Sequence, residues 1–452
     1  MIKKEQFSGQ MNFLMPGLAE QLQNTHPIYQ LALATKWDFF DKEFSKYYRA
    51  DFGRPALPIR LMVSLLILKH LRNLSDESVV EQWAENVYYQ FFSGQKVFTP
   101  KPPCSPTELV NFRDRIGPDG VEKILQESIR INGKGGKEKE IVADTTVQEK
   151  NITFPTDSKL HQKIITKCLA IAEQEDLTLR QSYRRTVPKL RYQQRGRNHP
   201  KHAAKARKAD NRIKTIAGIL VREIDRKLPP NHPYANDVTL FKNVLKQKRN
   251  DSNKIYSLHE PHVCCISKGK DHKKYEFGNK VSILTTKRSG IIVGALSIEQ
   301  NTYDGKTMEP ALEQYQRLLG TEPKKVLADL GYRGRTMINQ TQIITPAERK
   351  KLQTDYQKKK HKKDMARRSS IEPVIGHLKQ DNRLGRNYLK GIKGDQINVM
   401  LAAAAFNFRR FMRRKLNTLL ERFYYAAQWI LVFTYEIQNP LQPMPLPLIF
   451  QK

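Results

Sequence analysis

The sequence is poor in cysteine and has no long apolar run. Its four cysteines in 452 residues lack CxxC spacing, which argues against a disulfide framework and a structural zinc site. The longest apolar stretch, Phe423–Tyr435, is too short to span a bilayer. The first ten residues are polar, so we expect no secretory signal. These absences predict a reduced, cytoplasmic protein of bacterial type without a membrane partner.

Acidic residues are also scarce. Aspartate and glutamate number 45 against 79 lysine and arginine residues, which leaves a net charge of +34. A purely metabolic role does not require this surplus, whereas a polyanionic partner favours it. Nucleic acid is the first candidate, because neutralising its phosphates releases counterions, and an anionic membrane surface is the second. Hydrophobic residues make up 39% of the chain, which is enough for folded cores.

The hydrophobic pattern divides the chain into three parts. Residues 1–132 have helical patterning and predict an N-terminal domain for DNA binding or dimerisation, with a structural cap as the alternative. Residues 139–420 mix strands and helices around a strongly basic helical stretch at about 157–250. This order predicts an α/β core that carries a helical insertion. Residues 421–452 form a tail, rich in aromatics and proline, of unknown role.

The positive charge is concentrated in two segments. Residues 181–215 contain twelve Lys or Arg and one Asp, and residues 349–368, which we interpret as a linker, contain ten Lys or Arg and two Asp. Together they carry +19 of the total charge. Because arginine suits bidentate contacts with phosphate, we expect the first segment to bind DNA rather than form a solvated helix face. The candidate contacts there are Arg184, Arg185, Arg191, Arg195 and Arg197.

Two aspartates are placed for chemistry. Asp144 lies in an apolar strand, Lys139–Val147, where a lone carboxylate is costly unless it is paired or binds a cation. Asp329 ends a second apolar strand, Val326–Ala328, and precedes a glycine-containing loop, the usual position of function in open α/β sheets. Any single aspartate of this kind is more often a cap or turn residue, so the pair matters more than either alone.

A glutamate supplies the third carboxylate. Glu372 lies on an expected helix from Arg367 to Gln380, where about 100° per residue places it on one polar stripe with Arg368 and Lys379. Three convergent carboxylates suit two Mg²⁺ ions, with Mn²⁺ as an alternative. Two such ions can activate a nucleophile and stabilise a leaving oxygen in phosphodiester chemistry.

These acidic residues fall in segments that resemble a known family. The chain resembles bacterial insertion-sequence transposases of the DDE type over roughly residues 10–415, and is most similar to the IS5-like group of the IS4-related class. Residues 144–157 (DTTVQEKNITFPTD) resemble the family's first-aspartate block, and residues 328–334 (ADLGYRG) its second. Residues 274–280 and 301–306 are also similar to family segments.

The third block of the family reads Tyr-x2-Arg-x3-Glu-x6-Lys. Arg368, Glu372 and Lys379 fall at that spacing, but Met365 stands in place of the tyrosine. In the family this tyrosine is associated with contact to DNA near the transposon end. The departure leaves the three carboxylates intact and puts that contact in doubt.

The resemblance implies an RNase H-like catalytic core in which Asp144, Asp329 and Glu372 hold two Mg²⁺ ions. Such an enzyme cuts DNA at the element's ends, and the freed 3′-hydroxyl attacks target DNA. Arg368 and Lys379 would position phosphates. Tyr332 and Arg333 would be DNA-facing loop residues.

The implied partners are the terminal inverted repeats and target DNA, both double-stranded. Cutting two ends in concert implies a homodimer in the synaptic complex, and the DNA partner implies association with the bacterial nucleoid. The gap between Asp329 and Glu372 leaves room for one more strand, Gln340–Thr345.

Other functions stay open from sequence alone. A decayed or repurposed transposase that only binds DNA is favoured by Met365 and the unusual tail, but it does not account for the three carboxylates. A basic nuclease would share the metal site and yield cut but not joined products. A membrane-surface role is weakest, because the basic segments lack the wide apolar face of interfacial helices.

Overall fold

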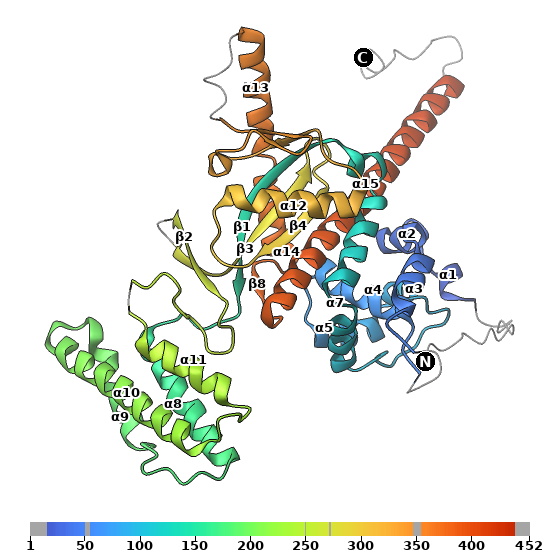
Figure 1. Ribbon diagram of the computed structural model, residues 1–452. Helices are drawn as coiled ribbons and strands as arrows, with labels where there is room; N and C mark the ends of the chain where they lie inside the picture. Colours follow the sequence, from blue (N-terminus) through green and yellow to red (C-terminus); the bar gives the residue numbers. More distant parts are fainter. Residues whose placement is uncertain (1–15, 50–54, 249, 271–272, 347–353, 439–452) are drawn as a thin grey trace.

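The computed structural model describes residues 16–49, 55–248, 250–270, 273–346 and 354–438. They form a mixed α/β body with a helical lobe at one end (Figure 1). None of the described helices has both the length and the apolar composition of a membrane span.

Helices make up the chain before the first strand. They are α1 (Leu18–Gln21), α2 (Pro27–Ala34), α3 (Trp37–Ser45), α4 (Ile59–Leu71), α5 (Asp76–Glu85), α6 (Val87–Phe92) and α7 (Pro106–Arg130), followed by the short 3-10 helix η1 (Gly133–Lys137). Helix α4 is apolar on almost every side, and all its residues except Arg60 are buried, as expected of a helix inside a helical layer. Helix α5 begins where Ser75 accepts a hydrogen bond from the Ser78 amide, a typical N-cap.

The central sheet is mixed. Its strands are β1 (Glu140–Lys150), β2 (Cys264–Lys270), β3 (Lys273–Thr286), β4 (Ile292–Ile298), β5 (Lys325–Leu327), β6 (Met337–Ile338), β7 (Thr341–Ile344) and β8 (Arg386–Asn387). The order β4-β3-β1-β5-β7-β6 runs across the sheet, with β2 on the first half of β3 and β8 on the end of β1. Strands β1, β5 and β7 are parallel, and β3 and β4 alternate in direction beside them.

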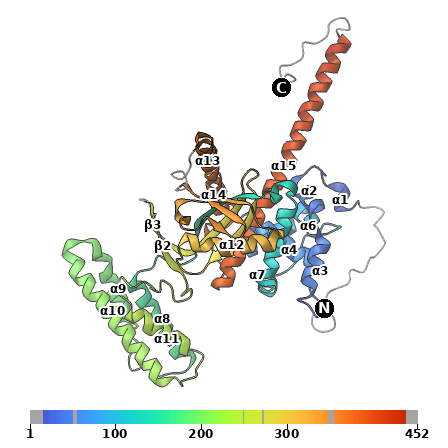
Figure 2. The ribbon, with the colours of Figure 1, turned by 45° about the horizontal axis from the view of Figure 1, so that its top comes forward.

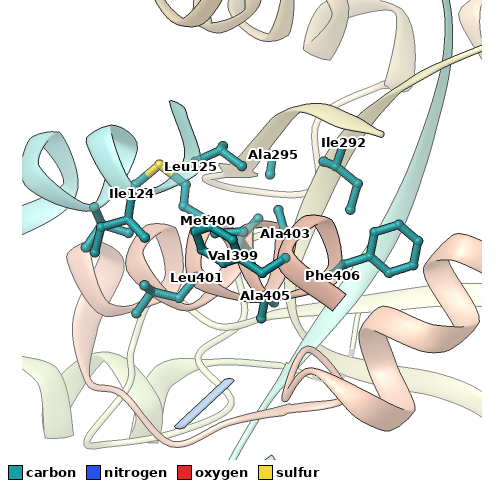
Figure 3. Packing of buried hydrophobic residues seen from close by; sticks show 14 of the residues in the cluster. Ile124, Leu125, Ile292, Ala295, Val399, Met400, Leu401, Ala403, Ala405 and Phe406 are labelled. Atoms are coloured by element: carbon teal, nitrogen blue, oxygen red, sulfur yellow. The ribbon is translucent and has the colours of Figure 1, made fainter. Parts of the chain in front are cut away.

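The remaining helices of the body are α12 (Asp304–Leu319), the 3-10 turn η3 (Leu330–Tyr332), α13 (Asp355–Arg368), α14 (Ile371–Asp381) and the long α15 (Gly391–Gln438). Helix α15 packs on α7, α4 and β4. Figure 3 shows Met400 and Phe406 of α15 among Leu125 of α7 and Ile292 and Ala295 of β4. The N-terminal helices and the sheet therefore share one hydrophobic core.

Side-chain amides cover the edge of the sheet at β4. Asn407 accepts from the Ile292 amide at 2.9 Å and donates to the Ile292 carbonyl at 2.8 Å. Gln396 accepts from the Ser297 amide and donates to the Ala295 carbonyl. These amides of α15 take the place of a further strand, so the edge offers fewer open backbone groups to another chain.

The basic insertion folds as a lobe of its own (Figures 1 and 2). It contains α8 (Asp157–Gln174), α9 (Thr186–Gln194), the 3-10 turn η2 (Arg195–Asn198), α10 (Pro200–Lys227) and α11 (Ala235–Lys246). Its buried side chains, among them Ile164, Ile216 and Phe241, form a second core separate from that of the body. These helices, Asp157 to Lys246, occupy the segment expected as a helical insertion at about 157–250.

Two expected elements differ from the structure. The lysine-rich segment 349–368, expected to be a linker, is helix α13 over its described part, and the expected helix Arg367–Gln380 is split between α13 and α14 at Ser369 and Ser370. Pro373 explains the split, because it has no amide hydrogen and its ring would clash with the carbonyl of Ser369 in a continuous helix. Helix α15 also continues past residue 420, so part of the expected tail is helical, while 439–452 lie outside the described residues.

Candidate active site

The two aspartates lie side by side on the sheet. Strands β1 and β5 are parallel with Val142 beside Leu327, so the same register, continued by two residues, places Asp144 beside Asp329. Asp329 still has extended backbone angles (φ −78°, ψ 172°), and the Ala328 amide still bonds to the Ile344 carbonyl. Both side chains therefore point to one face of the sheet at the same level.

Helix α14 covers that face. Asp144 and Gln148 lie four residues apart on β1 and so share a face, and Gln148 bonds to Asn398 and to the carbonyl of Asp395 on α15. Helix α14 packs on both β1 and α15, so it lies over the same side. Its apolar residues, Ile371, Val374 and Leu378, are buried, as the predicted apolar stripe requires. The fold thus brings the helix of Glu372 to the face of the two aspartates.

The carboxylates differ in exposure and partners. Asp144 is half-buried and its Oδ1 accepts from the Thr145 amide at 2.7 Å, whereas Asp329 is exposed and its Oδ1 accepts from the Leu330 amide at 2.7 Å. The Glu372 side chain is 62% exposed and lies 3.6 Å from the Arg368 guanidinium, so these two residues remain neighbours across the helix break. The oxygens of all three are hard ligands of the kind Mg²⁺ prefers.

The three carboxylates do not form a closed metal cage. Among the described residues, no group of three or more His, Cys, Asp or Glu side chains lies close enough together to hold a metal ion. The two aspartates fit Mg²⁺ in chemistry and relative placement, and Glu372 is directed toward Arg368 instead. Lys379, one stripe position further along, lies 3.7 Å from the buried Glu276.

The loop after Asp329 corrects one expectation. Tyr332 is only 3% exposed, so it does not face DNA, and burial raises the pKa of its phenol, which keeps the hydroxyl protonated. It is buried because η3 turns the loop back onto α12, where Thr307 lies beside the phenol. Arg333 is exposed, as a contact with DNA requires.

An ion pair that the sequence analysis did not assign supports this region from the other face. Asp304, the first residue of α12, accepts from Lys280 at 2.9 Å and from Thr145 at 3.1 Å. A side chain at Gly331 would meet the Asp304 carboxylate at 2.8 Å, so a larger residue there would force this carboxylate to shift. Asp304 therefore lies beside Thr145, which follows Asp144, and beside Gly331, two residues after Asp329. Its sequence signal was weak, because nothing in residues 301–306 indicates a contact with Lys280.

The insertion displays its cations on the outside. All five candidate arginines are exposed, and Arg191, Arg195 and Arg197 line a surface cavity of about 700 Å³ with Tyr192 and Lys159. Two of these arginines are in ion pairs: Arg184 lies 3.7 Å from Glu173, and Arg197 lies 2.5 Å from Asp210. This surface can accept phosphates, with a tyrosine available for stacking.

Comparison with known families now identifies the class. The model described as Transposase domain (DUF772) matches residues 17–115, and the model described as Transposase DDE domain matches residues 236–408. The second match includes Asp329 and Glu372 and begins after Asp144. Together the two matches indicate a DDE transposase.

One curated relative is similar to part of the chain. It is the "Uncharacterized protein ORF8 in nfe locus" of Rhizobium meliloti, 41% identical over 163 residues, which span 35% of this chain and 78% of the relative. No solved structure matches the chain significantly.

Proposed function

We propose that the protein is an IS5-like transposase with an RNase H-like core, which cuts DNA at transposon ends and joins the freed 3′-hydroxyls to target DNA. The observation that carries this proposal is the placement of Asp144 and Asp329 at one level on one face of adjacent parallel strands. The strand order β4-β3-β1-β5-β7, in which β3 alone runs antiparallel to the other four strands, supports the RNase H-like assignment.

Asp144, Asp329 and Glu372 would hold two divalent ions, Mg²⁺ or Mn²⁺. When bound, such ions activate a water or 3′-hydroxyl and stabilise the leaving oxygen. The Glu372 side chain is 62% exposed, so it could turn from Arg368 toward the metal ions. The Arg368 guanidinium would then be available to the scissile phosphate. Lys379 and Arg333 would bind flanking phosphates.

The other parts of the chain would hold the DNA. The insertion arginines would bind the duplex of the terminal inverted repeat, and the N-terminal helices would help to recognise it. Two copies would act together in the synaptic complex, because both ends must be cut in concert. A DNA partner places the protein at the nucleoid in the cytoplasm.

The test uses purified protein, Mg²⁺ and a plasmid carrying the element's ends. Asp144→Asn and Asp329→Asn should each abolish cleavage while the affinity for end DNA stays within about twofold, since neither change removes a cation. Glu309→Gln is the matched control, because Glu309 is a 56% exposed carboxylate on α12 that pairs with Arg335. Wild-type cleavage in either aspartate variant would refute the assignment.

A DNA-binding protein without catalysis is the second candidate. It is favoured by Met365, which is half-buried and packs against the core, and so offers no aromatic side chain to DNA. The same plasmid assay separates the candidates, because this protein would bind the ends and leave them uncut. A plain nuclease would yield cut ends and no joined products.

A further inference from the structure

Helix α13 stands out from the body (Figures 1 and 2), and its last residue, Arg368, lies 3.6 Å from Glu372 of the candidate active site. It carries Lys358, Lys359, Lys360, Lys362 and Lys363, and all five are exposed. At about 100° per residue these lysines cover an arc of roughly 200°. His361, Asp364 and Met365 fall on the opposite side.

That opposite side anchors the helix. His361 contacts the Thr345 carbonyl at 3.0 Å, and Asp364 accepts from Lys287 at 2.7 Å. Arg367 donates to the carbonyls of Lys287 and Arg288 at 2.9 Å each, and Thr354 begins the helix with a capping box. The helix is therefore fixed at its base, close to Arg368 and Glu372, with its lysines directed to solvent.

The lysines of α13 are available to a partner. Lys358 lies 3.5 Å from Asp355, whereas Lys359, Lys360, Lys362 and Lys363 make no ion pair with any carboxylate that the structure describes. Four cations within about one and a half turns of a fixed helix give a dense positive surface, which can neutralise phosphates of a duplex backbone.

The insertion has a different surface. Its basic segment places arginines among Tyr192, Gln193, Asn198 and other polar side chains. In α13, after the exposed Asp355, Tyr356 and Gln357 of the first turn, every exposed residue between 358 and 363 is lysine. Lysine contributes charge to phosphate contacts, while arginine and amides supply the bidentate pairings that distinguish bases. In both views the insertion and α13 lie apart, on different ends of the sheet (Figures 1 and 2).

We propose that α13 binds the target duplex through its phosphates, without reading its sequence, while the insertion binds the transposon end. This assignment rests on the proposed function, because only a strand-transferring enzyme must hold two different duplexes. The position of α13 beside Glu372 places the target backbone within reach of the joining chemistry.

The test compares two variants that each lose four cations. The α13 variant carries Lys359→Gln, Lys360→Gln, Lys362→Gln and Lys363→Gln, and the matched insertion variant carries Arg184→Gln, Arg185→Gln, Arg191→Gln and Arg195→Gln. Glutamine keeps helix propensity close to that of lysine and arginine, and circular dichroism checks that both fold. The substrates are plasmid-borne ends for cleavage, and a precut end with a supercoiled plasmid for joining.

We expect the α13 variant to lose at least tenfold in joining at 150 mM salt, with end cleavage within twofold of wild type. Joining should recover at low salt, and its dependence on salt should become shallower, by up to about 0.9 in log–log slope for each lysine that contacts a phosphate. The insertion variant should instead lose end cleavage. Equal losses of cleavage and joining in the α13 variant would overturn the assignment.

A binding measurement separates this proposal from the proposed function. Fluorescence anisotropy with a 30-bp duplex of random sequence requires no catalysis, and the α13 variant should bind it at least fivefold more weakly than wild type at 150 mM salt. Unchanged affinity overturns the role of α13 whatever the activity. If the wild type cuts and joins DNA but the α13 variant joins normally, only the role of α13 fails. A wild type that neither cuts nor joins contradicts the proposed function instead.

Discussion

The buried carboxylate of Asp395 lies where the insertion joins the body, and its removal should strongly destabilise the fold. Its side chain is 1% exposed and lies 2.5 Å from the amine of Lys150 at the end of β1. Asn279 and Asn387 each donate to it at 2.6 Å, and His262, on the segment returning from the insertion, lies at 3.0 Å. One carboxylate thus joins β1, β3, β8 and the returning segment to α15.

Asp395→Ala leaves the Lys150 amine buried, with Glu260 at 3.4 Å as its remaining carboxylate. Breaking a buried ion pair costs about 3–5 kcal/mol, and we expect about 3 kcal/mol here because Glu260 remains. Two amides that lose their acceptor add about 0.5–1 kcal/mol each. The free energy of unfolding should therefore fall by about 4–5 kcal/mol, or about a thousandfold in the folding equilibrium.

Urea unfolding followed by circular dichroism measures this loss. The control is Asp225→Ala, which removes a carboxylate 2.7 Å from Lys242 in a surface pair about 40% exposed, and should cost under about 1 kcal/mol. A loss below about 1 kcal/mol for Asp395→Ala, equal to that of the control, would refute the argument that this cluster holds the junction.

Two further predictions concern the body. The fully buried His70 contacts Asn398 on α15, and desolvation lowers its pKa to about 3. Below pH 6 the unfolded chain therefore binds a proton at His70 that the native protein does not, and the free energy of unfolding should fall by about 1.4 kcal/mol per pH unit from pH 6 to pH 4. His70→Gln should reduce that slope in acid titrations at fixed urea. Gly278→Ala should prevent folding or lower the free energy of unfolding by more than about 3 kcal/mol, because a Cβ there would lie 1.9 Å from the Gln148 carbonyl on the neighbouring strand β1. A melting temperature equal to that of the wild type would contradict this strand register.

Short runs of apolar residues predict the strands of this protein well. The strand that holds Asp144 and the strand just before Asp329 lie near their expected bounds, and the strand expected at Gln340–Thr345 is β7, Thr341–Ile344. Their pairing could not be read from the sequence, because it depends on β5 lying parallel to β1 with Val142 beside Leu327. The side-by-side position of Asp144 and Asp329 therefore follows from the β1–β5 strand register, which a sequence pattern does not give.

The expectations that proved wrong have local causes. The lysine-rich sequence of 349–368 predicts a linker; in the structure α13 forms there, with the capping box of Thr354 and polar anchors such as His361. The resemblance implies that Tyr332 faces DNA, yet the loop turns inward over α12 and buries it. The break before the helix of Glu372 follows from Pro373 itself, because proline lacks the amide hydrogen and its ring clashes with the carbonyl four residues earlier.

The shared core of α4 and α15 has a consequence for synthesis. His70 contacts Asn398, 328 residues later in the chain. The apolar helix α4 can therefore pack on α15 only after most of the protein has been translated. At about 5–20 residues per second, that interval is roughly 15 to 65 seconds. Because α4 also packs on α3, α5 and α7, only its side facing α15 stays exposed during this time, and we expect a chaperone to bind that apolar surface until α15 is made.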